Sequence, residues 1–317
     1  MELSIVISLF NEVESLPELV AWIGRALEGK VSSYEIIMVD DGSTDGSWDK
    51  IVELSASCPQ IRGIRFRRNY GKSAALYEGF AAAQGDIVVT MDADLQDDPE
   101  EIPEMMRMIR EDGYDLVSGW KRKRYDDVLT KNIPSKIYNA TARKVTGIKL
   151  HDMNCGLKAY RNEVVKNIEV YGDMHRFIPY LAKQAGFGKI GEKEVHHQAR
   201  KYGKSKFGLE RFIHGFLDLM TIWFLQKFGK KPMHFFGAMG TGTFLVGFVI
   251  TLWIIIEKLI RQGAGRPFRA VTDQPLFYLA LLAIILGSML FLTGFIAELI
   301  SRSNQDRNRY NIRERLR

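Results

Sequence analysis

The sequence predicts an α/β protein in which a mostly parallel, Rossmann-like sheet is followed by interfacial amphipathic helices and a two-helix transmembrane hairpin. Three observations lead to this fold class. The first 120 residues alternate short β-rich runs with segments of helical spacing, acidic residues follow three of those runs, and two late segments of more than 20 residues carry no charge. Strand–helix alternation is typical of a parallel sheet covered by helices on both faces.

Five short runs rich in β-branched and apolar residues are the predicted strands. They cover residues 3–8, 35–40, 61–66, 86–92 and 115–119. Four segments with apolar residues at helical spacing lie between them and cover residues 15–28, 47–57, 72–84 and 99–110. Ser73 is a predicted helix opener. The run Asp98-Pro99-Glu100-Glu101 places a cap, a proline and two acids at a helix N-terminus.

Two uncharged segments predict the membrane hairpin. Residues 235–256 hold no charged side chain over 22 positions, and residues 274–297 hold none over 24. About 20 apolar residues span the hydrocarbon core as a helix, and buried helices of soluble proteins rarely run this long without a charge. The pairs Ala238/Gly242 and Thr243/Gly247 predict a close approach of the two helices.

The segment before the hairpin has an amphipathic pattern. Within residues 207–228, apolar residues recur at helical spacing and basic residues border them. The pattern fits helices lying in the membrane interface, or an amphipathic helix packed on the preceding domain. The predicted organisation is a globular domain, an interfacial segment, a hairpin and a basic tail, covering residues 1–203, 204–231, 232–300 and 301–317.

The charge distribution predicts the orientation and argues against a nucleic-acid partner, because the basic residues flank the apolar segments and the predicted sheet edge is acidic. Residues 1–120 hold 23 acidic and 10 basic side chains, whereas the remainder holds 15 and 34, within a net charge of +6. Basic residues flank both ends of the hairpin, so the positive-inside rule places the globular domain and both termini in the cytoplasm. The basic tail fits anionic headgroups or a plain orientation signal. Two cysteines argue against a disulfide framework.

Acidic residues follow three predicted strands. Glu12 lies after the first, Asp40 and Asp41 end the second, and Asp92 and Asp94 end the fourth. In open α/β sheets, ligands bind beyond the carboxyl ends of the strands. Clustered carboxylates repel one another unless a cation joins them, and hard oxygen ligands suit Mg²⁺ or Mn²⁺ better than zinc. Asp92 and Asp94, with the neutral oxygen of Gln96, therefore form the predicted metal site.

These motifs resemble those of the inverting family 2 glycosyltransferases, and more narrowly the polyprenyl-phosphate group that includes dolichol-phosphate mannose synthases and undecaprenyl-phosphate glucosyltransferases. The resemblance covers roughly residues 3–210, and the uncharged hairpin matches the membrane-anchored members. The motifs are Phe10-Asn11-Glu12, Val39-Asp40-Asp41-Gly42-Ser43, Asn69-Tyr70-Gly71-Lys72, Asp92-Ala93-Asp94-Leu95-Gln96-Asp97-Asp98-Pro99-Glu100, Asp152-Met153-Asn154-Cys155-Gly156-Leu157-Lys158 and Arg200-Lys201-Tyr202-Gly203-Lys204-Ser205-Lys206-Phe207.

The resemblance implies a GT-A fold and a role for each matching position. Asp40, Asp41, Glu12 and Lys72 would bind the nucleotide, and Asp92, Asp94 and Gln96 would hold Mg²⁺ or Mn²⁺. Asp152 matches the family's catalytic acidic residue, whose carboxylate acts as a base or positions the acceptor. The alternative is an aspartate that only caps a helix. A further set of residues would contact the phosphates of the donor or the acceptor: Lys121, Arg124, Lys131, Ser135, Arg200 and Lys206.

Two positions depart from the family pattern. Ser8-Leu9 replaces the common proline before the Phe10-Asn11-Glu12 motif, which affects a turn more than the chemistry. Lys121 stands where arginine is usual and lacks its bidentate fork, so Arg122 and Arg124 are alternatives for that role. The Gln-x-x-Arg-Trp motif of processive synthases has only a partial echo in Gln198-Ala199-Arg200-Lys201-Tyr202, which argues against a polymerising enzyme.

The resemblance implies an integral enzyme of a bacterial inner membrane that moves one hexose from a nucleotide-sugar to a polyprenyl phosphate. UDP-glucose or a related UDP-hexose is the favoured donor, and undecaprenyl phosphate is the favoured acceptor. GDP-mannose as donor, another lipid acceptor such as diacylglycerol, and a catalytically dead membrane scaffold are the alternatives. The hairpin also allows a homo-oligomer. Inversion at the anomeric carbon follows from a single in-line attack.

Overall fold

The computed structural model describes residues 1–122, 133–202, 220–221, 224, 227–228, 232–267, 269–303 and 312–316. The chain forms two compact units. The first comprises Met1–Met220 together with Arg307–Arg317, and the second comprises Thr221–Asp306. Most of the predicted interfacial segment, residues 204–231, lies outside the described residues.

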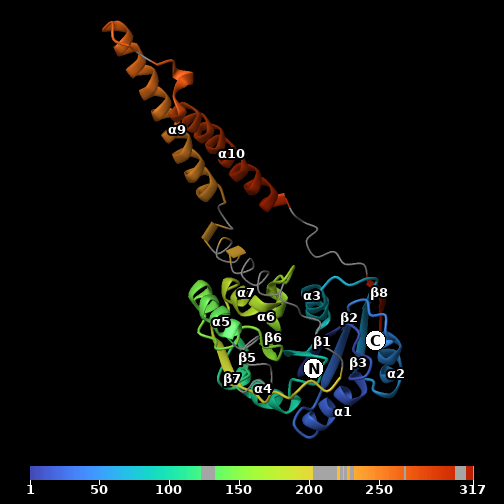
Figure 1. Cartoon of the computed structure of the whole chain (residues 1–317). Coiled ribbons are helices and arrows are strands. Elements are labelled where there is room, and N and C mark those ends of the chain that lie inside the picture. Colours follow the sequence, from blue (N-terminus) through green and yellow to red (C-terminus); the bar gives the residue numbers. More distant parts are fainter. Residues whose placement is uncertain are drawn as a thin grey trace. The chain divides into compact units, whose positions relative to one another are not determined.

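The first unit is built on one mixed sheet with strand order β7-β5-β6-β4-β1-β2-β3-β8 (Figure 1). Strands β4, β1, β2 and β3 are parallel neighbours, and β5 is parallel to β7. β6 is antiparallel to β4 and β5, and β8 is antiparallel to β3. The bounds are β1 Leu3–Leu9, β2 Tyr34–Asp40, β3 Ile61–Phe66, β4 Ile87–Asp92, β5 Leu116–Trp120, β6 Lys158–Arg161, β7 Ile190–Glu194 and β8 Ile312–Arg315.

The predicted alternation of strands and helices is confirmed over the first 120 residues, where every bound agrees within two residues. Asp98 caps the turn after β4, since its Oδ1 accepts a hydrogen bond of 2.9 Å from the Glu100 amide. Ser73 is not the opener of α3, which begins at Lys72 after Gly71. The helical elements are α1 Leu16–Leu27, α2 Ser47–Ser57, α3 Lys72–Ala82, η1 Pro99–Glu101, α4 Ile102–Arg110, α5 Ile133–Thr146, α6 Asn162–Asn167, η3 Met174–Phe177 and α7 Ile178–Gln184.

Helices cover both faces of the sheet, as the alternation predicts. On β1, Ile5 and Ile7 enter a core that includes Leu19 of α1. Val6, which points to the other face, enters a second core that includes Ala75 of α3. Successive strand residues point to opposite faces, so a continuous apolar run is the pattern that a strand buried on both sides requires.

The end of the chain joins the sheet as β8. Arg315 pairs with Ile64 in register, and the backbone of Leu316 exchanges hydrogen bonds with that of Gly63. An ion pair of 2.7 Å joins Arg315 to Glu78 of α3. β8 therefore covers the outer edge of β3, which would otherwise present unpaired backbone groups. The predicted basic tail thus contains a strand, which its short sequence pattern did not indicate.

The second unit is a helical hairpin of α9 (Pro232–Gly263) and α10 (Pro275–Ser303), both long and apolar enough to cross a membrane. The helices meet at glycines. A Cβ on Gly240 would lie 2.6 Å from the Phe291 amide, one on Gly247 would lie 2.5 Å from the Ala280 carbonyl, and one on Gly287 would lie 2.5 Å from the Phe244 amide. The predicted contact at Gly247 is confirmed. A Cβ on Gly242 would meet no atom of the described residues within 4 Å, so the predicted close contact at Gly242 is wrong.

Candidate active site

The carboxyl ends of β1, β2 and β4 lie together at one edge of the sheet. Ser8 of β1 pairs with Asp92 of β4, and Leu9 pairs with Asp40 of β2. A cavity of about 430 Å³ lies at this edge. Its charged lining includes Glu12, Asp41, Lys72, Asp92, Asp94, Asp173, Arg176 and Arg200. The structure therefore brings residues from five of the predicted motifs to one hollow.

The two aspartates that end β2 have different surroundings. Asp41 lines the cavity and accepts hydrogen bonds from the Tyr70 amide at 2.7 Å and the Gly71 amide at 2.9 Å. Burial outweighs these two bonds and raises the pKa of Asp41 to about 6. Asp40 is fully buried, accepts a bond of 2.9 Å from the Ser43 amide, and is not among the described residues that line the cavity. Its contacts shape the turn after β2.

Two basic side chains neutralise the carboxylates of the cavity. Lys72 donates to Asp92, and Arg200 lies 2.6 Å from Asp94 and 3.5 Å from Glu12. Burial alone would raise the pKa of Asp92, but the charge and hydrogen bond of Lys72, together with the charges of Lys121 and Lys158, outweigh burial and lower it. Burial, together with the charge of Asp92, raises the pKa of Asp94 to about 6. A cluster of this kind attracts a further cation, because its acids repel one another.

Asp92 and Asp94 fit a hard divalent cation. Both line the cavity, and both offer carboxylate oxygens of the kind that Mg²⁺ and Mn²⁺ prefer. A Cβ at position 156 would lie 2.6 Å from Asp92 Oδ2, so the glycine allows this carboxylate to pack against the backbone. The described residues contain no group of three His, Cys, Asp or Glu side chains that could hold a metal ion. Water and phosphate oxygens would complete the coordination, as is usual for Mg²⁺.

Gln96 contacts this pair through its backbone, since its amide donates to Asp94 Oδ1 at 3.2 Å, whereas its side chain bonds elsewhere. The side-chain amide of Gln96 donates to the backbone carbonyl of Gln198 at 3.4 Å, and the backbone carbonyl of Gln96 accepts from the backbone amide of Gln198. Gln96 is not among the described residues that line the cavity. These two bonds join the loop after β4 to the segment that carries Arg200. The role of Gln96 as a metal ligand stays a prediction.

Asp152 lies in the loop that joins α5 to β6. It is 2% exposed, its Oδ1 accepts a hydrogen bond of 3.1 Å from the Asn154 amide, and its own amide donates to Glu192 of β7. The bond to Asn154 closes a turn inside this loop and is not a helix cap, because the described element that follows is the strand β6. Asp152 is not among the described residues that line the 430 Å³ cavity, and its catalytic role stays a prediction.

The predicted phosphate-contacting set is only partly described. Lys121 forms a buried ion pair of 2.6 Å with Asp97. Burial alone would lower the pKa of Lys121, but the charge and hydrogen bond of Asp97, together with the nearby Cys155 and Asp92, outweigh burial and raise it. Arg122 instead lies 3.3 Å from Glu194, at the surface. Ser135 lies in α5 but its side chain is not described, and three members lie outside the described residues: Arg124, Lys131 and Lys206.

Sequence reasoning missed three basic residues beside the cavity. His175 and Arg176 of η3 line both it and a smaller hollow of about 100 Å³, which Lys158 of β6 also lines. His175 Nδ1 lies 3.1 Å from the hydroxyl of Ser73, and burial lowers its pKa. Lys158 is 3% exposed, donates to the Cys155 carbonyl, and has its pKa lowered by burial. Lys158 is the last residue of a motif identified in the sequence. Because the strand β6 was not predicted, nothing in the sequence indicated that Lys158 lies beside the cavity.

Comparisons with known proteins identify the family. The sequence profile of Glycosyl transferase family 2 matches residues 4–169, which is just over half of the chain. The chain belongs to this family. It is 34% identical to the dodecaprenyl-phosphate galacturonate synthase of Rhizobium johnstonii over 96% of the chain and 88% of that protein. It is 36% identical to the undecaprenyl-phosphate 4-deoxy-4-formamido-L-arabinose transferase of Shewanella sediminis, over 98% of the chain and 91% of that protein.

Solved structures confirm the predicted GT-A fold of this family 2 glycosyltransferase. Glucosyl-3-phosphoglycerate synthase from Mycobacterium tuberculosis, in complex with Mn²⁺, UDP-glucose and phosphoglyceric acid, superposes with a TM-score of 0.54. The match covers 70% of this chain and 78% of that one at 20% sequence identity. At this identity the likeness concerns the fold alone. The resemblance to polyprenyl-phosphate glycosyltransferases is supported by the two relatives, which match nearly the whole chain.

Proposed function

We propose that this glycosyltransferase moves one sugar from a nucleotide-sugar to a polyprenyl phosphate at a membrane. The observation that carries the proposal is the cavity in which Glu12, Asp92 and Asp94 lie opposite Lys72 and Arg200. Acidic side chains hold a divalent cation, basic side chains bind phosphate oxygens, and a nucleoside diphosphate with its cation requires both. The acceptor is inferred from the names of the relatives, and the apolar hairpin fits a lipid substrate.

The reaction follows from the charges at the cavity. An oxygen of the acceptor phosphate forms a bond to the anomeric carbon while the bond from that carbon to the diphosphate breaks, which inverts the centre. An acceptor phosphate is already ionised near neutral pH, so it needs positioning more than deprotonation. Mg²⁺ or Mn²⁺ bound to Asp92 and Asp94 would neutralise charge on the leaving diphosphate. Arg200 and Lys72 would bind the diphosphate oxygens, and Asp152 would orient the acceptor.

The donor sugar is the finer part of the proposal. We favour a UDP-linked sugar, and the relatives point to galacturonate or 4-formamido-L-arabinose as candidates beside the glucose that the sequence favoured. We place the catalytic unit and both termini on the cytoplasmic side of a bacterial inner membrane, because basic residues flank both ends of the hairpin.

A donor screen tests the function. The purified full chain is incubated with Mg²⁺ or Mn²⁺, a short polyprenyl phosphate and one donor at a time: UDP-glucose, UDP-galacturonate, UDP-4-deoxy-4-formamido-L-arabinose or GDP-mannose. Release of nucleoside diphosphate that depends on the lipid, together with a phosphate-containing glycolipid, is the expected result. Diacylglycerol in place of the polyprenyl phosphate is the control. No release with any donor, or a product without phosphate, would contradict the proposal.

A further inference from the structure

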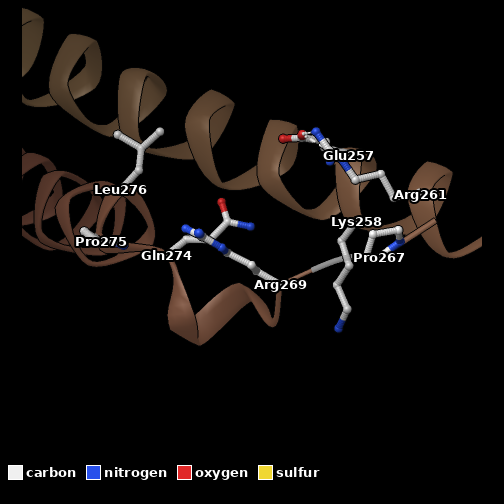
Figure 2. A pocket seen from close by; sticks show the side chains of 8 residues that line it. All are labelled: Glu257, Lys258, Arg261, Pro267, Arg269, Gln274, Pro275 and Leu276. Carbon is white, nitrogen blue, oxygen red and sulfur yellow. Dashed lines mark hydrogen bonds and ion pairs between the residues drawn. The ribbon is translucent and has the colours of Figure 1, made fainter.

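The turn of the hairpin encloses a hollow that the transfer reaction does not use. It measures about 570 Å³, within the usual range for small-molecule sites. The end of α9, the link and the start of α10 all contribute to it (Figure 2). Its lining consists of Glu257, Lys258, Arg261, Pro267, Arg269, Gln274, Pro275 and Leu276.

The hollow carries a net positive charge. Three basic side chains and one acidic side chain line it, which leaves two positive charges in excess. Glu257 accepts hydrogen bonds from Arg261 at 2.9 Å and 2.6 Å, so the single acid is already paired. Among the described residues, Arg269 has no carboxylate within ion-pair distance, and Figure 2 shows its side chain extending toward Gln274. The lining therefore suits an anion.

Exposed apolar side chains lie next to the lining residues along α9 and α10. Leu259 and Ile260 near the end of α9 are 61% and 66% exposed, and Leu279 near the start of α10 is 61% exposed. Tyr278 is also exposed, one turn into α10, where aromatic residues are enriched at the boundary between hydrocarbon and headgroups. When α9 and α10 span a membrane, their shared turn comes to the headgroup region, where phosphate groups are presented.

We propose that this hollow binds the phosphate of an anionic phospholipid, whose acyl chains lie along the exposed faces of α9 and α10. The excess of positive charge favours a lipid with net negative charge over a zwitterionic one, whose ammonium group the lining repels. The apolar border favours a lipid over free phosphate. The proposal is independent of the transfer reaction, because every residue in it belongs to the hairpin.

A pair of matched variants tests the site in the full chain, purified in a neutral detergent. Short-chain phosphatidylglycerol is titrated by calorimetry, with phosphatidylcholine of the same chain length and inorganic phosphate as parallel probes. Arg269→Gln removes a lining charge, whereas Arg266→Gln removes one charge from the same link at a residue outside the lining. We expect Arg269→Gln to weaken phosphatidylglycerol binding about 10-fold, as the loss of a charge-assisted hydrogen bond would. Arg266→Gln should change it less than about 2-fold.

Three outcomes would overturn the proposal. If both variants weaken phosphatidylglycerol binding equally, the attraction is a diffuse one to the charged link. If phosphatidylcholine binds as tightly as phosphatidylglycerol, net lipid charge has no role. If inorganic phosphate binds as tightly, the acyl chains contribute nothing. Helical content is checked by circular dichroism for each variant. If Arg269→Gln fails to fold, Lys258→Gln, which removes another lining charge, takes its place against the same control.

Discussion

At the scale of single residues, Lys72 has the clearest part in the cavity. Its ammonium group donates to Asp92, which is one of the two carboxylates proposed for the metal. A cation that binds Asp92 must therefore compete with Lys72. The side chain is long and flexible, so it can leave the carboxylate for a phosphate oxygen of the donor.

Replacement of Lys72 by methionine should separate metal binding from donor binding. Without the ammonium group, Mn²⁺ alone should bind about 10-fold tighter, because no positive charge competes for Asp92. UDP in the presence of Mn²⁺ should bind more weakly, because one phosphate contact is lost. Paramagnetic resonance of free Mn²⁺ measures the first effect and calorimetry with UDP the second. Lys50→Met is the control, since Lys50 pairs with Glu53 on the surface of α2; unchanged Mn²⁺ affinity in Lys72→Met would contradict the competition.

A methyl group at position 156 should disturb the carboxylates without unfolding the sheet. The new Cβ would lie 2.6 Å from Asp92 Oδ2 and 2.9 Å from Asp97 Oδ2, so both side chains must move. Transfer should fall about 100-fold, since displacements near 1 Å at a reacting centre have effects of that size. Steady-state rates measure the loss. Gly188→Ala is the matched control, because a Cβ on Gly188 would meet none of the described atoms within 4 Å; equal rates in the two variants would argue against the contact.

The residue scale also shows where prediction from sequence reached its limit. Asp92, Asp94 and Arg200 were predicted from motifs, and the structure brings them together. Gln96 lies in one of those motifs and Lys121 at a position matched to the family, yet the Gln96 side chain bonds to Gln198 and Lys121 pairs with Asp97. Side-chain direction after a strand end depends on which loop packs beside it, and the sequence pattern of one segment does not contain that information.

At the scale of elements, short helices and strands were predicted best where their pattern is local. α2 has the predicted bounds of Ser47–Ser57, and β3 has the predicted bounds of Ile61–Phe66. β6, β7 and β8 were missed, because each has only four or five residues and takes its stability from its sheet partners. The antiparallel position of β6 between β4 and β5 carries Lys158 to the cavity region.

The hairpin provides an element-scale prediction. An alanine at Gly287 would place its Cβ 2.5 Å from the Phe244 amide, which forces α9 and α10 apart. We expect a loss of about 1–3 kcal/mol in stability, the usual effect of overpacking a close contact. Titration of the purified full chain with sodium dodecyl sulfate, followed by helical circular dichroism, measures it. Gly242→Ala, with no neighbour within 4 Å, should leave the midpoint unchanged; equal shifts would disprove the glycine interface.

At the scale of the whole molecule, the two compact units combine a catalytic fold with lipid-facing helices. The acidic first 120 residues contain the proposed metal ligands, and the basic remainder contains the hairpin and its flanks. The net charge of +6 is therefore the sum of two opposite distributions with different roles. The basic residues fit phosphate groups of lipids and substrates.

Membrane topology can be tested by thiol labelling in intact bacterial cells. A hairpin that crosses twice places its turn on the side opposite both termini. In a Cys58→Ser background, Arg266→Cys should react with a membrane-impermeant maleimide in intact cells. The unchanged chain, whose partly exposed thiol is Cys58, should react only after lysis. Labelling of Arg266→Cys only after lysis would show that the hairpin does not cross.

The sequence alone determined the strand–helix order, the acidic strand ends and the apolar hairpin, because periodicity and charge-free length are local properties of a segment. It also carried the motifs from which the family could be inferred. Only the tertiary structure decided that β8 covers β3, that Gly240 and Gly287 bring the long helices together, and that Lys72 and Arg200 meet the carboxylates. These contacts join residues far apart in the chain, and their partners are selected by packing in three dimensions.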